Sequence, residues 1–249
     1  MTEAVIVSTA RTALTKSFRG SFNDTEAPVL GGHVVRAVVE RAGIEPGLAE
    51  DVIMGAAVQQ GTQAYNIGRL CAYTGGLPDS VPGMALDRMC ASGLMSIGVA
   101  AKNILAGEMK IAVAGGVESL SLTQTKHKNT SRAQSLAVQE VVPSAYIPML
   151  ETAEIVSRRY DISREAQDAY ALQSQQRTAA AQAAGLFDAE IAPITVTAGV
   201  ADKLMGLTTK QVTVSKDEGT REGTTKEGIS GIRPALPGGV VAAGNASQF

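Results

Sequence analysis

The sequence predicts a layered α/β fold that carries a mostly helical insertion. Short apolar stretches alternate with segments of helical periodicity up to about residue 121, and the chain then becomes more polar and helical. Strands separated by helices need crossover connections, which place parallel strands in a sheet covered by helix layers. We expect an α/β domain at 1–121, a mostly helical insertion at 122–237, and a segment at 238–249 that turns apolar again.

The first domain alternates strands and helices in order. Apolar stretches predict strands at 4–7, at 51–57, in the segment that ends at Met89, and at 111–114. Helical spacing of apolar residues predicts helices at 30–42, at 63–75 and directly after Cys90. Gly107 is typical of the residue that ends a helix.

The second domain begins with a polar, basic stretch at 123–132, which we expect to be a loop. Met149, Ala153, Val156 and Tyr160 recur at helical spacing. Ser163 is a good N-cap for a longer helix that Gly185 would end. Strand-like patterns follow at 186–196, at 211–214 and at 240–243.

Composition limits the classes of partner. The 249 residues carry a formal net charge of −2 with 45% hydrophobic residues, so there is no general attraction to nucleic acid or to an anionic membrane. The two cysteines lie in unlike contexts and give no disulfide framework, which favours a reducing compartment. The N-terminus lacks the layout of a signal peptide and no uninterrupted apolar run approaches about 20 residues. We therefore expect a cytoplasmic protein without a nucleic-acid or membrane partner.

Cys90 is the candidate nucleophile because it lies at a strand-to-helix turn among small residues. Unpaired amides and the positive end of the dipole at a helix N-terminus favour a thiolate there. The local pattern alone leaves a second interpretation open, in which Cys90 is a small buried apolar residue. Cys71 lies inside a predicted helix without a turn signal, and we expect it to pack in the core.

Several motifs occur in the order found in one enzyme family. They are VIVSTARTAL near the N-terminus, MCASGL around Cys90, GGVESLS after the next helix, ETAEIVSRRYDISREAQDAYALQSQQR with GLFDAEIAPI, and AAGNAS near the end. Together they resemble the thiolase family, the acyl-CoA C-acyltransferases. The resemblance implies that 122–237 is the family's CoA-binding loop domain and that 238–249 is the start of the segment that returns to the N-terminal domain. Ala13 stands where the family usually has proline, and Ala242 where it has threonine.

The resemblance implies that Cys90 attacks a 3-ketoacyl thioester and carries the acyl group, with coenzyme A as a substrate, no permanently bound cofactor and no metal. It also implies that Arg221 lies near the CoA nucleotide, that Ser247 contacts the pantetheine arm, and that Met149 lines the acyl pocket. The residues that flank Met149 differ from the family pattern, so the acyl chain length stays open. Four lysines could attract the phosphates or form a solvated charged face: Lys203, Lys210, Lys216 and Lys226.

Thiolases also use a histidine in a Gly-His-Pro segment and a second cysteine in a Cys-x-Gly-Gly segment, both in a C-terminal repeat domain. This sequence contains neither segment, and its histidines are His33 and His127. We expect that repeat domain to be absent, and neither histidine to be the catalytic base. The chain is then either one piece of a thiolase or a short, non-catalytic acyl-CoA-binding or regulatory protein. A cysteine hydrolase unrelated to thiolases is a third hypothesis and needs a histidine beside Cys90.

An exposed sheet edge and apolar surface are expected where the C-terminal domain would pack. We therefore expect a homo-oligomer. A separate polypeptide that carries the C-terminal thiolase half is the other partner that this surface would fit.

Overall fold

The computed structural model describes residues 3–202 and 204–248, and the chain divides into two compact units. The first unit comprises Met1–Lys128 and Asp188–Glu218, and the second comprises Asn129–Phe187 and Gly219–Phe249. These units are defined by compactness. The domain bounds expected from the sequence follow the family pattern and stay a prediction.

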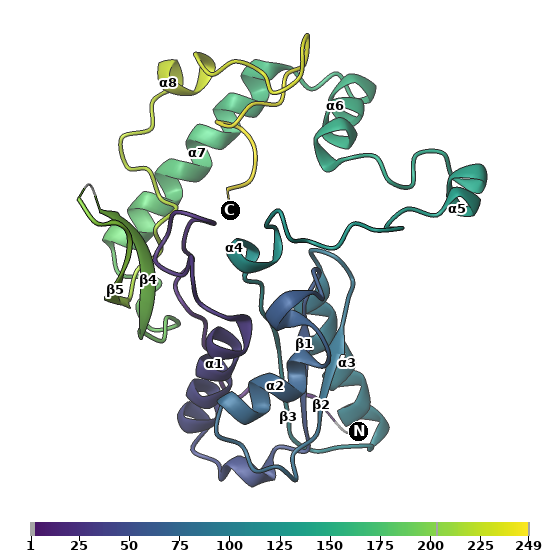
Figure 1. Ribbon diagram of the computed structural model, residues 1–249, viewed down its shortest axis with the longest axis vertical. Helices are drawn as coiled ribbons and strands as arrows, with labels where there is room; N and C mark the ends of the chain where they lie inside the picture. Colours follow the sequence, from purple (N-terminus) through teal and green to yellow (C-terminus); the bar gives the residue numbers. More distant parts are fainter. Residues whose placement is uncertain (1–2, 203, 249) are drawn as a thin grey trace. The chain divides into compact units, whose positions relative to one another are not determined.

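A three-stranded parallel sheet forms the centre of the first unit, in the strand order β2-β1-β3 (Figure 1). The strands are β1 (Asp51–Gly55), β2 (Gly83–Leu86) and β3 (Ala112–Gly116). In the register of the sheet Gly55 lies opposite both Leu86 and Gly116, so the carboxyl ends of the three strands meet at one edge. The predicted α/β class is confirmed.

Helices cover the sheet because both faces of the central strand are apolar. Val52 and Met54 of β1 belong to the core that helices α1 (Ala27–Ala42) and α2 (Ile67–Thr74) complete. Ile53, between them, points to the opposite face and is also fully buried. Helix α3 (Ser92–Ala106) contacts both β1 and β3, so it covers that second face (Figure 1). Two short 3-10 helices, η1 (Pro46–Leu48) and η2 (Gly61–Gln63), complete the connections.

Helix α3 keeps part of its apolar surface uncovered. Its buried residues are Ser92, Ser96 and Ala100, whereas Leu94 is 74% exposed and Leu105 53% exposed. The segment 89–106 is long and apolar enough to cross a membrane by length and composition, which the sequence analysis did not expect. Because the helix packs on β1 and β3, we interpret it as a helix of the α/β layer with one open face.

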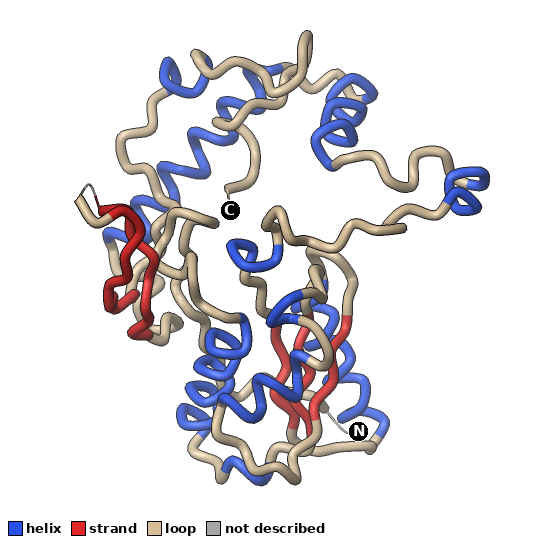
Figure 2. The backbone as a smooth tube through the Cα atoms, viewed as in Figure 1, coloured by secondary structure: helices blue, strands red, loops and turns tan. Residues whose placement is uncertain are grey.

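An antiparallel ribbon of two long strands also belongs to the first unit (Figure 2). It is formed by β4 (Ile194–Asp202) and β5 (Gly206–Val214), which extends the strand patterns expected at 186–196 and 211–214. The loop domain expected at 122–237 therefore includes a β ribbon as well as helices.

The prediction of a strand at 4–7 is wrong for the part of the chain that the structure describes. The backbone of residues 3–10 forms no strand, and Val5, Ile6 and Val7 are 69–78% exposed. A strand needs a neighbour that accepts and donates its backbone hydrogen bonds, and no described segment pairs with these residues. The first ordered pairing is the isolated bridge between Arg11 and Ile191.

The short helix α4 (Leu120–Thr123) belongs to the first unit. The other remaining helices belong to the second unit: α5 (Leu136–Val141), α6 (Met149–Arg159), α7 (Arg164–Ala183) and α8 (Lys226–Ser230). The Ser163 hydroxyl accepts a hydrogen bond from the Ala166 amide at 3.2 Å, as expected of an N-cap, and Gly185 has a φ of 70°. The strand expected at 240–243 does not form: the amides of Val240 and Val241 donate to the buried Glu154 carboxylate, and the Ala242 amide donates to the Asn245 side chain.

Candidate active site

Cys90 lies in the turn that joins β2 to α3, directly before Ala91, which is the N-cap of α3. Its side chain is exposed, so the alternative of a buried apolar residue is excluded by its environment. Met89, the residue before it, has a φ of 50°. This left-handed conformation is rare for a residue with a side chain and costs on the order of 1–3 kcal/mol. The turn that presents Cys90 is therefore under backbone strain.

A small hydrogen-bond network holds this turn. The buried Ser92 hydroxyl accepts from the Arg88 amide at 2.9 Å and donates to the Met89 carbonyl at 2.6 Å. The Asp87 carboxylate accepts from the Met89 amide at 2.6 Å. The polar groups on both sides of Cys90 are thus fixed while its own side chain is left in solvent.

Small residues allow the start of α3 to approach the sheet closely. A Cβ added at Gly116 would lie 2.9 Å from the Gly93 Cα, and one added at Gly55 would lie 2.7 Å from the Gly93 amide nitrogen. The fully buried Ser96 hydroxyl bonds to the Gly93 carbonyl at 2.7 Å and to the Gly115 carbonyl at 2.6 Å. The helix N-terminus is therefore seated on the carboxyl ends of β1 and β3.

The start of α3 has no side-chain cap on its first amides. These amides carry the partial positive charge of the helix N-terminus. Cys90 directly precedes the N-cap of α3. A thiolate at Cys90, or an oxyanion formed on a thioester beside it, would therefore lie near this positive end. The geometry suits nucleophilic attack on a carbonyl group.

Cys71 provides the contrast. It is fully buried within α2 and is free, and burial raises the pKa of its thiol to about 12. The expectation that Cys71 packs in the core is confirmed, and it stays a thiol at neutral pH.

Neither histidine is bonded to Cys90 in the part of the chain that the structure describes. The His33 Nε2 lies 3.1 Å from the Ala192 carbonyl oxygen, and His127 is exposed in a loop. A cysteine hydrolase would need a base at hydrogen-bond distance from its nucleophile, so that hypothesis gains no support here.

Two residues near the same sheet edge were missed by the sequence analysis. The Glu118 carboxylate follows β3 and accepts from the Ala57 amide, which follows β1, at 2.9 Å. The buried Gln63 side chain donates to Glu118 and accepts from the Ser119 amide. Together they tie the loops that leave β1 and β3. The glutamate within GGVESLS was a usable signal, whereas nothing in the local sequence singled out Gln63.

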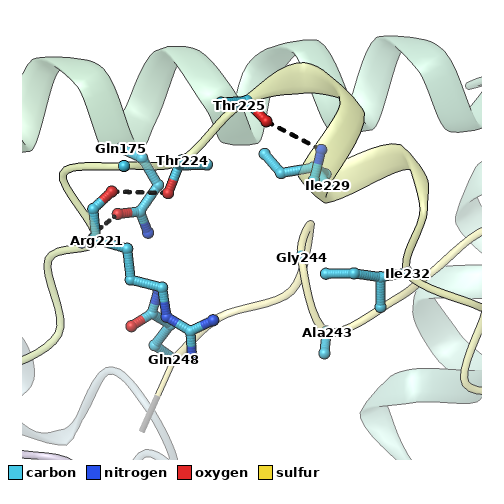
Figure 3. A pocket seen from close by; sticks show the side chains of 11 residues that line it. Gln175, Arg221, Thr224, Thr225, Ile229, Ile232, Ala243, Gly244 and Gln248 are labelled. Carbon is cyan, nitrogen blue, oxygen red and sulfur yellow. Dashed lines mark hydrogen bonds between the residues drawn. The ribbon is translucent and has the colours of Figure 1, made fainter.

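The second unit holds a hollow of about 310 Å³ beside α8. Polar side chains line one part of it and apolar groups the other (Figure 3). Arg221 and Gln248 both line the hollow (Figure 3), and the Arg221 amide donates to the Gln175 side chain at 3.1 Å. A hollow lined by a guanidinium and two side-chain amides suits an anionic, polar ligand. The lining residues are Gln175, Arg221, Gly223, Thr224, Thr225, Gly228, Ile229, Ile232, Ala243, Gly244 and Gln248; below they define the Arg221 hollow.

Comparison with known proteins identifies the family. The family model described as "Thiolase, N-terminal domain" matches residues 4–249. This chain belongs to the thiolase family. The match confirms the resemblance seen in the sequence motifs and agrees with the observed α/β fold.

Solved and curated thiolases resemble the chain over its whole length. A 3-ketoacyl-CoA thiolase of Bacillus subtilis is 41% identical over all of this chain and 63% of its own length. A peroxisomal 3-ketoacyl-CoA thiolase of Yarrowia lipolytica is 39% identical over 99% of this chain and 59% of its own. The crystal structure of the Bacillus anthracis acetyl-CoA acetyltransferase has a TM-score of 0.83 at 35% identity, and covers 100% of this chain and 63% of that one. The chain thus spans less than two thirds of these thiolases.

The structure places the other residues expected at a thiolase site in different surroundings. Arg221 lines the hollow, whereas Ser247 precedes the lining residue Gln248 and is itself exposed. Met149 begins α6, is 76% exposed and does not line the hollow. Their roles toward CoA stay predictions. Of the four lysines, Lys210 and Lys216 belong to the first unit and Lys226 to the second, while Lys203 lies outside the described residues.

Proposed function

We propose that the whole protein is a thiolase-type acyl-CoA C-acyltransferase in which Cys90 carries the acyl group. The exposed Cys90 on its strained turn, at an uncapped helix N-terminus, is the observation that carries the proposal. The names of its relatives, 3-ketoacyl-CoA thiolase and acetyl-CoA acetyltransferase, support acyl transfer between CoA thioesters. Fatty acid metabolism is the process that such a reaction would serve.

The reaction has two halves. In the first, the Cys90 sulfur attacks the 3-keto carbonyl of a 3-ketoacyl-CoA, the bond between C2 and C3 breaks, and its electron pair stays on C2. Protonation of C2 releases acetyl-CoA and leaves an acyl-Cys90 thioester. In the second, the sulfur of a free CoA attacks that thioester, and acyl-CoA leaves as the Cys90 thiolate returns. The reverse sequence condenses two acyl-CoA molecules.

This chain supplies the nucleophile and its setting. The seat formed by Gly55, Gly93 and Gly116 holds the start of α3 close against the sheet, and the amides at the start of α3 offset negative charge on sulfur or on the tetrahedral oxygen. The Glu118–Gln63 pair holds the neighbouring loops in place.

The steps that move protons need a base and an acid. Because His33 is bound to a backbone carbonyl and His127 is exposed in a loop, we assign these steps to a C-terminal thiolase half, continuous with this chain or separate from it. The greater length of the relatives supports that assignment. The open face of α3 and the sheet edges at β2 and β3 are surfaces on which such a half or a second copy could pack.

Coenzyme A is proposed as the ligand of the Arg221 hollow. The Arg221 guanidinium would pair with phosphate, and Ser247 beside Gln248 would contact the pantetheine arm. Met149 would line the acyl pocket in the whole protein, and the acyl chain length that this pocket accepts is open. The bacterial thiolases among the relatives favour a cytoplasmic location, although peroxisomal thiolases are also similar.

The test measures thiolysis of acetoacetyl-CoA and of a longer 3-ketoacyl-CoA. Gel analysis and intact mass first establish which polypeptides the preparation contains. We expect turnover in a preparation that contains a C-terminal half, its loss in Cys90→Ala, and its retention in the matched control Cys71→Ala. Arg221→Ala should raise the KM for CoA with a smaller effect on kcat. Turnover that survives Cys90→Ala would overturn the proposal.

A further inference from the structure

Two carboxylates in the second unit are buried and take no part in the proposed chemistry. Glu154 in α6 is 3% exposed and Asp168 in α7 is 4% exposed. Burying a carboxylate costs free energy unless hydrogen bonds replace those to water. The hydrogen-bond partners of each carboxylate therefore show which segments it holds in place. In both cases the partners lie on segments that line, or lead into, the Arg221 hollow.

Arg164 joins Asp168 to one wall of the hollow. Its Nε lies 2.8 Å from each oxygen of Asp168, and its Nη2 donates to the carbonyls of Ile229 and Ile232 at 3.0 and 2.8 Å. Both isoleucines line the hollow. One guanidinium therefore clamps the end of α8 and the residues after it to α7.

Asn245 joins the same aspartate to a second, adjoining wall. Its Nδ2 donates to Asp168 Oδ1 at 2.9 Å and to the Val240 carbonyl at 3.1 Å. Its Oδ1 accepts from the Ala242 amide at 2.8 Å. Asn245 thus fixes the turn that carries the lining residues Ala243 and Gly244.

Glu154 holds the start of this turn. One of its oxygens, Oε1, accepts from the amides of Val240 and Val241 at 2.9 and 2.8 Å. Those two amides would otherwise be available for a strand, which is why the strand expected there is missing.

The two walls meet without a side chain between them. A Cβ added at Gly244 would lie 2.9 Å from the Ile232 side chain and 3.0 Å from that of Ile229. A small shift of either segment would therefore change the shape of the hollow (Figure 3).

We propose that Arg164, Asp168 and Asn245 are positioning residues that fix both walls of the Arg221 hollow through one shared carboxylate, so that CoA meets a preformed surface. This inference rests on the proposed function, in which the hollow takes CoA. A planar guanidinium can bind a carboxylate and two carbonyls in fixed directions, and the point charge of lysine cannot. Arg164→Lys should accordingly loosen both walls while conserving charge.

The experiment uses the 249-residue chain and two readouts: hydrogen exchange of the segments 229–232 and 240–245, and the Kd for CoA by calorimetry. Arg177→Lys is the matched control, because Arg177 is exposed on the same helix. We expect Arg164→Lys to accelerate exchange in both segments and to weaken CoA binding about tenfold. Asn245→Ala should accelerate exchange in 240–245 alone and also weaken binding, and Arg177→Lys should change neither readout.

The outcomes separate the two proposals. If the wild-type chain does not bind CoA, the proposed ligand of the hollow is wrong, and the exchange data still decide whether one network fixes both walls. Faster exchange in 229–232 alone for Arg164→Lys would overturn the coupling. Faster exchange in both segments with unchanged CoA affinity would overturn the positioning role. If Arg164→Lys does not fold, Asn245→Ala decides: unchanged exchange in 240–245 or unchanged CoA affinity contradicts the proposal.

Discussion

Gly55 lies where the central strand meets the start of α3, and replacing it tests the seat of the nucleophile turn. In Gly55→Ala the new Cβ would overlap the carbonyl group of Ser92 and lie 2.7 Å from the Gly93 nitrogen. Non-bonded heavy atoms prefer separations of about 3.5–4.0 Å. The first turn of α3 must therefore retreat from the sheet by roughly 1 Å, taking Cys90 with it.

The expected cost combines two opposing effects. Overpacking of a fitted interior costs about 1–3 kcal/mol, whereas alanine gains about 0.5–1 kcal/mol over glycine in a strand. Since backbone atoms cannot turn aside as a flexible side chain would, we expect Gly55→Ala to lower the free energy of unfolding by about 2 kcal/mol. Urea unfolding followed by circular dichroism measures this change, and the rate of Cys90 alkylation reports on the displaced turn.

Gly98→Ala is the matched control. Gly98 lies in α3, the helix that the Gly55 substitution would displace, and a Cβ added there meets nothing within 4 Å. This variant should be more stable than the wild type by about 0.5–1 kcal/mol. Equal stability of Gly55→Ala and the wild type would refute the proposed close seat of α3 on β1.

Two further predictions concern the cysteines and the first unit. Iodoacetamide at pH 8 should modify Cys90 and not Cys71 in the folded chain, because burial raises the pKa of the Cys71 thiol to about 12. In urea both cysteines should react. Modification of both at equal rates in the folded chain would contradict the assigned environments. Burial opposes ionisation of Asp217, but the Arg11 guanidinium at 2.7 and 2.9 Å and the Leu14 amide outweigh it and lower the pKa of that carboxyl from its ordinary value. The resulting stability is present above the pKa of the unfolded chain and is lost as the pH falls through the folded value. Asp217→Asn should therefore cost about 1–2 kcal/mol at pH 7 and progressively less below pH 4; a cost that does not depend on pH would count against the ion pair.

Local patterns predicted the elements that carry their own signals. The Ser163 cap, the Gly107 stop and the apolar periodicity after Cys90 are local features, and α7 and α3 follow them. The parallel sheet also followed from the alternation of strands and helices.

The failures arose where a segment needs a distant partner. Residues 4–7 have strand composition, but an extended segment becomes a strand only when another pairs with it. The segment 240–243 has a partner of another kind, since the buried Glu154, 86 residues away from Val240, accepts from the amides of Val240 and Val241. Such pairings are not encoded in the local sequence.

The candidate site divides in the same way. The turn around Cys90 was predictable from small residues at a strand-to-helix junction, but the left-handed Met89 and the role of Gln63 were not. The Arg221 hollow depends on segments brought together by Asp168 and Asn245, which local periodicity cannot indicate.

Mass spectrometry of Cys90 after exposure to a 3-ketoacyl-CoA tests the central claim most directly. A preparation that contains the C-terminal half is mixed with substrate, quenched in acid and digested. We predict one acyl group on the peptide that contains Cys90, none on the peptide that contains Cys71, and release of the acyl group when CoA is added before the quench. Turnover without an acyl group on Cys90, or an acyl group that CoA does not remove, would contradict the account.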